Sequence, residues 1–202
     1  MSEAIKLPKK PKFENAAWNF KLDKVNLYAY LNDAFTKEEC EKIIKIAKNK
    51  GFIKGITRGE SDIRKSKISW LYPTDDDMEW VFRRVTDIIL NLNERFFGFD
   101  IFGLNEGFQF TNYKAPSDKY GKHVDRGFND VVRKLSISIQ LTDPKEYEGG
   151  ELYLYDNNEG QLMDKKQGTL IMFPSYVLHE VMPVTKGERN SLVTWVTGNQ
   201  FK

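Results

Sequence analysis

The chain contains only two histidines, and both stand in contexts that suit metal binding. His123 is followed two positions later by Asp125, and His179 comes much further along the chain. Residues i and i+2 of a β-strand point to the same side, so His123 and Asp125 can hold one ion from the end of one strand. Two imidazoles and one carboxylate form a facial triad, which suits non-haem Fe(II) and leaves coordination positions open. We therefore predict an iron site made of His123, Asp125 and His179.

Zinc is the main alternative ion for these ligands. Catalytic zinc usually takes three protein ligands that include more imidazole or thiolate. Zinc-dependent hydrolysis would also leave Arg189, which follows His179 in the sequence, without a role. An arginine stays charged and can hold a carboxylate through two parallel hydrogen bonds. The pattern favours an iron oxygenase whose second substrate carries a carboxylate that Arg189 binds.

Two further side chains are candidate donors to that carboxylate. Ser191 lies two residues after Arg189, and therefore on the same face of a strand. Tyr113 lies on the polar face of an earlier predicted strand, ahead of His123. We expect both side chains to help Arg189 bind the second substrate.

The first part of the chain predicts a strand and a helix that would support this site. Residues 25–31 alternate in the manner of a strand. Thr36 and Glu39 form a capping box, which predicts that a helix begins after Thr36. Apolar residues then recur at helical spacing until Gly51, which supplies the stop. The helix is predicted to be scaffold.

A second helix is predicted over residues 78–96, where one apolar stripe recurs at helical spacing and Gly98 supplies the end. Its N-terminus is expected to be capped within Thr74–Asp77, where the acidic residues meet the positive end of the helix dipole. Before it, a short strand is predicted over residues 67–72. The polar loop around Arg58–Arg64 is the predicted lid of the site, because long loops in compact domains are often functional.

From Gly107 the hydrophobic period changes from helical to alternating. Phe108 and Phe110 share one face of a predicted strand, and apolar positions between Leu135 and Leu141 alternate with polar ones in the same way. Further short strands are predicted over residues 151–155, 168–173 and 191–197. Helices followed by many short strands favour a mainly β, α+β architecture, in which a sandwich or jelly roll has helices packed on one side.

Composition narrows the class of protein. The 202 residues predict one domain from residue 17 to residue 202, with helical support at about 33–98 and a β core at about 105–200. Residues 1–16 are basic and proline-containing, and predict a flexible tail. One cysteine excludes an intramolecular disulfide. No apolar run is long enough for a membrane span, and the N-terminus lacks the apolar region of a signal peptide, so a cytoplasmic protein is expected.

These motifs together resemble the prolyl-4-hydroxylase branch of the 2-oxoglutarate- and Fe(II)-dependent dioxygenases. The resemblance rests on His123-Val-Asp125, on His179-Glu-Val-x-Pro183, and on Arg189 with Trp195 six residues later. Asp62-Ile-Arg64-x-x-Lys67-Ile-x-Trp70 is similar to a segment of the animal oxygen-sensing prolyl hydroxylases, as are Tyr113 and the Gly149-Gly150-Glu-Leu152 turn. Bacterial and phage members end in a run similar to Gly187–Ser191. With gaps, the similarity extends from about Phe35 to Trp195.

The resemblance implies a double-stranded β-helix with the N-terminal helices packed on its major sheet. It implies that His123, Asp125 and His179 hold Fe(II), and that Arg189, Tyr113 and Ser191 bind 2-oxoglutarate. It further implies that O2 is consumed, that succinate and CO2 are released, and that ascorbate serves as a reductant. In the oxygen sensors a further tyrosine contacts the co-substrate, and Ile139 stands at that position here.

The substrate is the least constrained expectation. Arg64, Trp70 and Trp195 are candidates to line the opening, and Arg126 and Arg133, which flank the iron strand, are candidates to attract an acidic or peptide substrate. The leading hypothesis is hydroxylation of a peptidyl proline, or of another protein side chain.

Two alternatives remain open. One is oxidation of a free amino acid, another small molecule or an alkylated base. The other is a non-catalytic β-helix that binds a ligand or partner. The near-neutral charge, with 31 basic and 29 acidic residues, disfavours a nucleic-acid substrate. No membrane partner is expected, and the sequence leaves the oligomeric state open.

Overall fold

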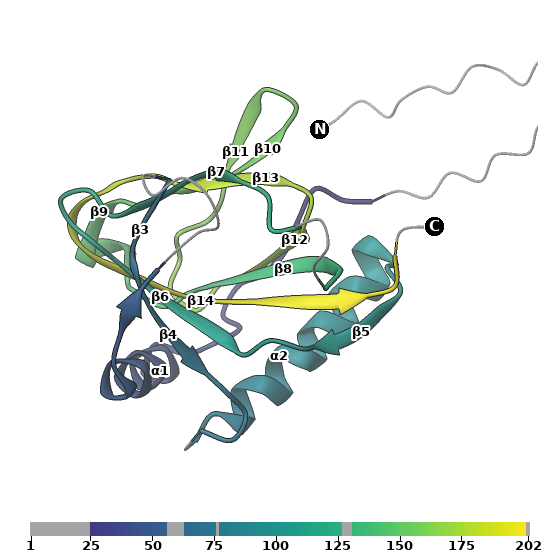
Figure 1. Ribbon diagram of the computed structural model, residues 1–202, viewed down its shortest axis with the longest axis horizontal. Coiled ribbons are helices and arrows are strands. Elements are labelled where there is room, and N and C mark those ends of the chain that lie inside the picture. The colour runs from purple at the N-terminus through teal and green to yellow at the C-terminus, as the bar shows by residue number, and fades with distance from the viewer. Residues whose placement is uncertain (1–24, 56–62, 76, 127–130, 201–202) are drawn as a thin grey trace, which may run out of the picture.

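A computed structural model of the chain describes residues 25–55, 63–75, 77–126 and 131–200. The predicted tail over residues 1–16, the predicted start of the domain at residue 17 and most of the predicted lid lie outside the described residues. Within the described part, two antiparallel β-sheets face each other and two α-helices cover the outer face of one of them (Figure 1). No helix in that part is long and apolar enough to span a bilayer.

The larger, major sheet joins nine strands of the described chain in the order β1-β12-β8-β14-β6-β4-β2, with β5 and β9 also paired to β14. Its strands are β1 (Ala29–Leu31), β2 (Ile53–Lys54), β4 (Lys67–Leu71), β5 (Ile101–Leu104), β6 (Phe108–Lys114), β8 (Arg133–Gln140), β9 (Tyr147–Gly149), β12 (Leu170–Pro174) and β14 (Val184–Gly198).

The minor sheet joins five described strands in the order β11-β10-β13-β7-β3. They are β3 (Arg64–Lys65), β7 (Lys119–His123), β10 (Leu152–Asp156), β11 (Glu159–Leu162) and β13 (Leu178–Val181). The helices are α1 (Lys37–Lys50) and α2 (Glu79–Leu92), with a π-helical turn at Asn93–Phe97 and a 3-10 turn at Pro144–Glu146. The predicted helical segment at about 33–98 therefore also supplies the strands β2, β3 and β4.

Helix α1 forms as its capping box predicts. The Thr36 side chain accepts a hydrogen bond from the backbone N–H of Glu39, and the Glu39 carboxylate accepts one from the backbone N–H of Thr36. The helix ends at Gly51, whose φ of 92° favours glycine. The predicted strand over residues 25–31 is shorter in the structure, because only Ala29–Leu31 pair with β12.

The predicted cap of the second helix within Thr74–Asp77 is wrong. Helix α2 begins at Glu79, and Met78 stands at its N-cap without a side-chain hydrogen bond. The Asp75 carboxylate instead accepts hydrogen bonds from the backbone N–H of Tyr72 and from Lys50, which closes a turn ahead of the helix. Asp75, which the sequence predicted to lie at the helix end, thus stabilises the preceding turn instead.

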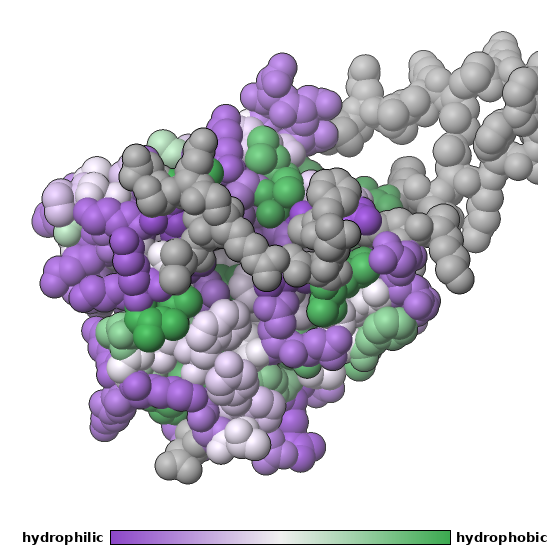
Figure 2. Space-filling view, in the orientation of Figure 1, coloured by the Kyte–Doolittle hydropathy of each residue, from purple (hydrophilic) through white to green (hydrophobic). Residues whose placement is uncertain are grey.

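The major sheet has an apolar outer face and a polar inner face. Phe108 and Phe110 of β6 join one core cluster with the buried faces of α1 and α2. Gln109, Thr111 and Tyr113, the alternate residues of the same strand, point to the space between the sheets and line a cavity there. The helices therefore bury the outer face, while the inner face is available for chemistry. The side of the molecule in Figure 2 is mostly hydrophilic, and its hydrophobic residues form separate small patches.

A second core cluster joins the two sheets. It contains Ile171 and Phe173 from the major sheet, and Leu154 and Val181 from the minor sheet. Burial of such side chains contributes roughly 25 cal/mol per Å² of apolar surface removed from water. This contact holds β7 and β13 over the polar inner face of the major sheet.

At Gly168 the backbone lies in close contact with the segment that leads into helix α1. It has φ +81°, and a Cβ atom there would overlap the carbonyl oxygen of Phe35, just ahead of α1. Gly98 is a matched control, because it has φ +65° but open space around it. We expect Gly98→Ala to cost about 1 kcal/mol, from the left-handed backbone alone. Gly168→Ala should cost about 2–5 kcal/mol, since overpacking is added. Urea unfolding of both variants measures the difference, and equal losses would contradict the close approach.

Candidate metal centre and its cavity

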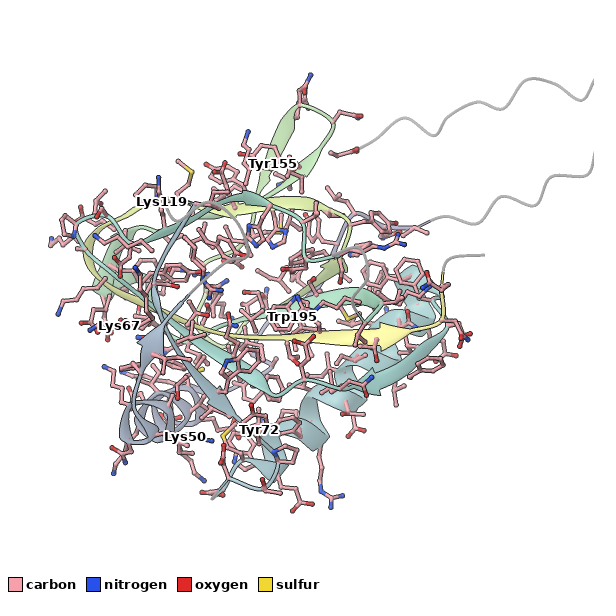
Figure 3. All side chains as sticks on the ribbon, viewed as in Figure 1. Lys50, Lys67, Tyr72, Lys119, Tyr155 and Trp195 are labelled. Carbon is pink, nitrogen blue, oxygen red and sulfur yellow. The ribbon has the colours of Figure 1, made fainter. Side chains whose placement is uncertain are left out.

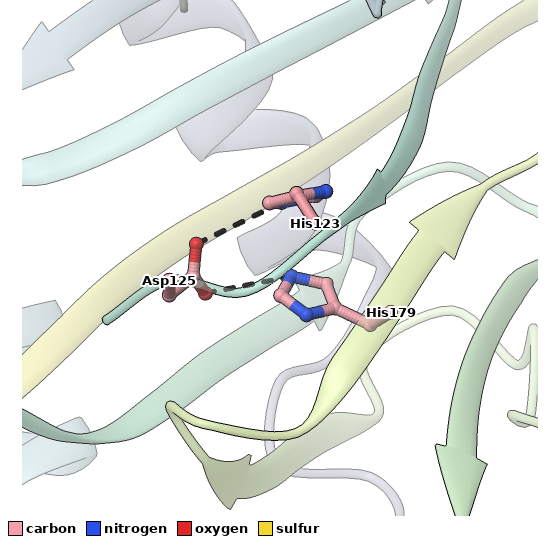
Figure 4. A group of neighbouring side chains, drawn as sticks. All are labelled: His123, Asp125 and His179. Carbon is pink, nitrogen blue, oxygen red and sulfur yellow. Dashed lines mark ion pairs between the residues drawn. The ribbon is translucent and has the colours of Figure 1, made fainter. Parts of the chain in front are cut away.

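His123, Asp125 and His179 converge between the sheets (Figure 4). Their ligand atoms all lie within 4.8 Å of one another. His123 Nε2 is 3.7 Å from Asp125 Oδ1, and His179 Nε2 is 3.5 Å from Asp125 Oδ2. The three side chains are only 14%, 9% and 7% exposed for His123, Asp125 and His179 respectively. The structure thus brings the predicted ligands together.

The strand register accounts for the two imidazoles. His179 of β13 pairs directly with His123, the last residue of β7. In each ring Nδ1 approaches the carbonyl oxygen two residues earlier, at 2.7 Å to Gly121 and at 2.9 Å to Val177. If Nδ1 donates its proton to that carbonyl, the lone pair of Nε2 faces Asp125. This donor set fits a ferrous ion, with two oriented imidazoles and one carboxylate.

Asp125 lies two residues past the end of β7, so the prediction of a shared strand holds only for His123. Hydrogen bonds replace the strand pairing. The backbone N–H of Asp125 donates to the carbonyl of Ser175, and the Ser136 hydroxyl donates to Asp125 Oδ2 at 2.7 Å. The Ser175 hydroxyl in turn lies 3.0 Å from that of Ser136. These contacts fix the orientation of the carboxylate.

The protonation states suit metal binding. Burial, together with the nearby His179, lowers the pKa of His123 to about 4, so its ring is neutral at pH 7. Burial alone would raise the pKa of Asp125, but the two imidazoles and the Ser136 hydroxyl outweigh it, and the pKa is lowered. Neutral imidazole and ionised carboxylate are the forms that coordinate a cation.

Arg189 lies in the same cavity on β14 and is only 1% exposed. Its Nη2 donates to Gln140 Oε1 at 2.8 Å, whereas Nη1 is buried and has no hydrogen-bond partner among the described residues. Tyr113 pairs with Arg189 in the sheet, and the guanidinium lies 5.4 Å from its ring centroid. Burial raises the pKa of Tyr113, so its hydroxyl stays a donor. Ser191 is buried and lines the same cavity.

Gln140 is the contact to Arg189 that the sequence reasoning missed. Ile139, where a co-substrate tyrosine is expected from the resemblance, faces the helices in the outer core. The inward residue next to it is Gln140, which holds the guanidinium. Alternation along β8 already marks Gln140 as polar and inward-facing, so period-two spacing was the signal that could have found it.

The predicted tryptophans are neighbours with different roles. Trp195 lines the cavity from β14, between the two sheets, while Tyr155 stands on the β10–β11 hairpin (Figure 3). Trp70 lies on β4 with its ring 6.3 Å from that of Trp195, and is not among the described residues that line the cavity. Trp70 therefore lies beside a cavity residue, and its place at the opening stays a prediction.

The flanking arginines are not cavity residues. Arg133 forms two hydrogen bonds with Glu106, at 2.7 and 2.6 Å, and its guanidinium lies 3.8 Å from the ring centroid of Trp195. Arg126 is half-buried beside the metal ligands and is likewise not among the described lining residues. A role of either cation in attracting a substrate therefore stays a prediction.

Arg64 is buried, contrary to its expected place on a lid. It begins the short strand β3, which pairs with β7 at Tyr120. Its guanidinium stacks at 4.6 Å on the Tyr120 ring, whose other neighbour is the His123 ring at 3.5 Å. Burial raises the pKa of Tyr120 to about 12, so the phenol is uncharged in this stack.

The pKa of His123 makes the stability of the metal-free protein depend on pH. The folded value of about 4 lies below the ordinary value of 6.5, so the unfolded chain binds more protons between these values. Stability is fully present above about pH 6.5 and should fall as the pH is lowered towards 4. Urea unfolding at several pH values measures this slope. His123→Gln should have a shallower slope, and an unchanged slope would contradict the assignment.

Sequence comparisons agree with this geometry. The sequence profile of the 2OG-Fe(II) oxygenase superfamily matches residues 108–197. A PKHD-type hydroxylase of Alteromonas mediterranea is 39% identical over 94 residues, which are 43% of this chain and 41% of that protein. A PKHD-type hydroxylase of Nitrosomonas europaea is 27% identical over 166 residues, or 79% of this chain and 73% of that protein. The chain thus spans less than half of the Alteromonas relative.

Solved structures share the fold. A prolyl-4-hydroxylase of Pseudomonas putida superposes with a TM-score of 0.71 and 19% identity, covering 86% of this chain and 94% of that one. A prolyl hydroxylase of Trichoplax adhaerens, in complex with a peptide fragment of a hypoxia inducible factor, gives a TM-score of 0.74 and 21% identity, covering 86% and 84%. The expected double-stranded β-helix with helices on its major sheet is therefore confirmed. Residues 108–197 thus resemble the 2OG-Fe(II) oxygenase superfamily, and the chain has the fold of these prolyl hydroxylase structures.

Proposed function

We propose that this protein is a dioxygenase that depends on Fe(II) and 2-oxoglutarate and hydroxylates a C–H bond. The observation that carries the proposal is the buried Nη1 of Arg189, which has no partner among the described residues and lies in the cavity that also holds His123, Asp125 and His179. A buried donor without a partner is costly, and a bound carboxylate would satisfy it. A metal site beside a carboxylate site is what this chemistry requires.

Each side chain has a definite task in this proposal. His123, Asp125 and His179 would hold Fe(II), with Ser136 keeping the carboxylate oriented. When bound, the iron supplies the oxidation chemistry by which 2-oxoglutarate, O2 and a C–H group become succinate, CO2 and a C–OH group. Ascorbate is the proposed reductant that keeps the iron ferrous.

Side chains of the major sheet would bind the co-substrate. Arg189 would pair with the carboxylate of 2-oxoglutarate that lies away from the metal, and Gln140 fixes the guanidinium from its other side. Tyr113 and Ser191 would donate further hydrogen bonds, because both line the cavity. Burial strengthens these interactions by excluding water, and holds the co-substrate in one orientation.

For the prime substrate we propose a peptidyl proline. The Trichoplax structure contains a peptide fragment, and the Pseudomonas protein is a prolyl-4-hydroxylase, which supports a peptide substrate for a chain with their fold. Trp195 would contact the substrate, because it lines the cavity next to Asp125. Hydroxylation of a free amino acid, another small molecule or an alkylated base, or ligand binding without turnover, are the outcomes that would replace this proposal.

Anaerobic reconstitution with Fe(II) and 2-oxoglutarate tests the proposed centre. We expect a metal-to-ligand absorption band in the wild type and, after addition of O2 and ascorbate, release of succinate. His179→Ala should lose the band, since one imidazole ligand is removed. Arg189→Ala should weaken 2-oxoglutarate binding about 30-fold or more, which corresponds to the loss of roughly 2 kcal/mol from a buried charge pair. Arg95→Ala, on the π-helical turn behind the major sheet, is the matched control.

The variants His179→Ala and Arg189→Ala test the metal site and the co-substrate site separately. A band that persists in His179→Ala would refute the metal assignment. A band that is normal, with unchanged co-substrate affinity in Arg189→Ala, would refute only the carboxylate role of Arg189.

Peptide libraries with and without proline test the substrate. We expect a mass increase of one oxygen on proline-containing peptides, with succinate formed in equal amount. The products are measured by mass spectrometry after incubation with Fe(II), 2-oxoglutarate and O2. Oxygen addition to free amino acids alone would replace the peptidyl-proline proposal, and binding of 2-oxoglutarate without any succinate would favour the non-catalytic alternative.

A further inference from the structure

Arg64 is a second buried cation of the cavity, on the sheet opposite Arg189. Its side chain is the one cationic group that the minor sheet contributes to the described cavity wall, and the residue is 7% exposed. Pairing of β3 with β7 places it beside Tyr120, and the stack of its guanidinium on the Tyr120 ring ends at His123. Arg64 and the proposed metal ligand His123 therefore both contact the Tyr120 ring.

The described hydrogen-bond partners of Arg64 are neutral. Its Nε donates to the Ser66 hydroxyl at 2.9 Å, and its Nη2 donates to Gln109 Oε1 at 2.6 Å. Among the described residues, no ion pair includes Arg64 and Nη1 has no hydrogen-bond partner. Two half-buried arginines differ from it, because Arg84 pairs with Glu39 and Arg133 pairs with Glu106.

A cation held away from water by neutral partners is poorly compensated. The hydroxyl of Ser66 and the amide of Gln109 replace part of the lost hydration, but neither supplies a negative charge. Their hydrogen bonds instead hold the guanidinium plane in one place, with its remaining N–H groups available to a ligand. Such a pre-oriented guanidinium matches the two oxygens of a carboxylate.

The charge of the cavity leads to the same conclusion. Its described lining contains two arginines and one aspartate as its charged side chains, the two histidines being counted as neutral. A ferrous ion would add two positive charges, and 2-oxoglutarate would add two negative charges. Among the described lining residues, one positive charge therefore stays in excess after the metal and the co-substrate are bound. A single carboxylate on the remaining ligand would neutralise it.

We propose that Arg64 binds a carboxylate of the prime substrate. This inference rests on the proposed function and specifies its substrate class. Arg189 is assigned the co-substrate, because its neighbours Tyr113 and Ser191 surround it on the major sheet. Arg64 faces the cavity from the minor sheet, so the two arginines receive two different anions. The carboxylate can belong to the end of a chain, to a free amino acid, or to an Asp or Glu side chain next to the hydroxylated residue.

The test compares acids with their amides. Wild-type protein loaded anaerobically with Fe(II) and 2-oxoglutarate is titrated with three matched pairs: an internal-proline peptide with a neighbouring Asp or Asn, a C-terminal proline peptide as acid or amide, and L-proline or L-prolinamide. Calorimetry measures the affinities without turnover. We expect the acid of at least one pair to bind about tenfold or more tightly than its amide, because hydrogen bonds to charged groups are worth more than neutral ones. The pair that responds identifies the source of the carboxylate.

Variants assign the preference to Arg64. Arg64→Gln should reduce the acid-to-amide ratio to near one, and Arg64→Lys should keep part of it. Lys65→Gln is the matched control, since Lys65 is the exposed neighbour on β3 and bonds Ser117. Circular dichroism checks that the variants are folded, and Arg64→Lys keeps the assignment to Arg64 testable if Arg64→Gln does not fold.

Failure of this inference is distinguishable from failure of the proposed function. If the iron and 2-oxoglutarate band forms but no pair shows an acid preference, whether through equal binding or through none, the role of Arg64 is overturned and the dioxygenase proposal stands. An acid preference that persists in Arg64→Gln would overturn it as well. A loss of 2-oxoglutarate affinity in Arg64→Gln as large as the loss of peptide affinity would assign Arg64 to the co-substrate instead. Absence of the band in the wild type would contradict the proposed function itself.

Discussion

The pairing of β7 with β13 is the constraint on which the centre depends. His123 and His179 are direct partners in this register, and each points inward because alternate residues of a strand face the same side. A slip of one residue would turn one imidazole to the outside of the minor sheet. The hydrogen bonds from the two rings to backbone carbonyls act only after this register is set, since they orient side chains that already face each other.

Hydrophobic packing selects that register. Leu154 pairs with His179 across β10 and β13, and Val181 lies two residues further along β13. Leu154 and Val181 belong to the cluster that also contains Ile171 and Phe173 of the opposite sheet. Any slip that turned His179 outward would turn Val181 outward too and expose apolar surface. The apolar contacts therefore specify the position of the polar centre, although they take no part in its chemistry.

Local sequence signals predicted the elements that depend on local contacts. The capping box at Thr36 and Glu39 and the alternation along β6 and β8 involve neighbours in sequence, and the structure follows both. The predicted cap of α2 was wrong because Asp75 bonds with Lys50 of another helix, which spacing does not reveal. The buried contacts of Arg64 and the contact of Gln140 with Arg189 were missed for a similar reason. Their surroundings come from strands distant in sequence, whereas the triad could be found because the chain has only two histidines and Asp125 stands two residues after one of them.

Burial of two arginines costs the ligand-free protein electrostatic free energy, and bound anionic ligands can remove that cost. Arg64 and Arg189 contribute like charges to one cavity, with Asp125 as its described acidic side chain, and the described hydrogen-bond partners of both arginines are neutral. The folded state must hold these cations out of water, while the unfolded chain hydrates them. A carboxylate bound to either arginine lowers that cost only in the folded state, so ligand binding and folding stability are coupled by mass action. The same burial that weakens the ligand-free fold therefore makes the cavity selective for anions.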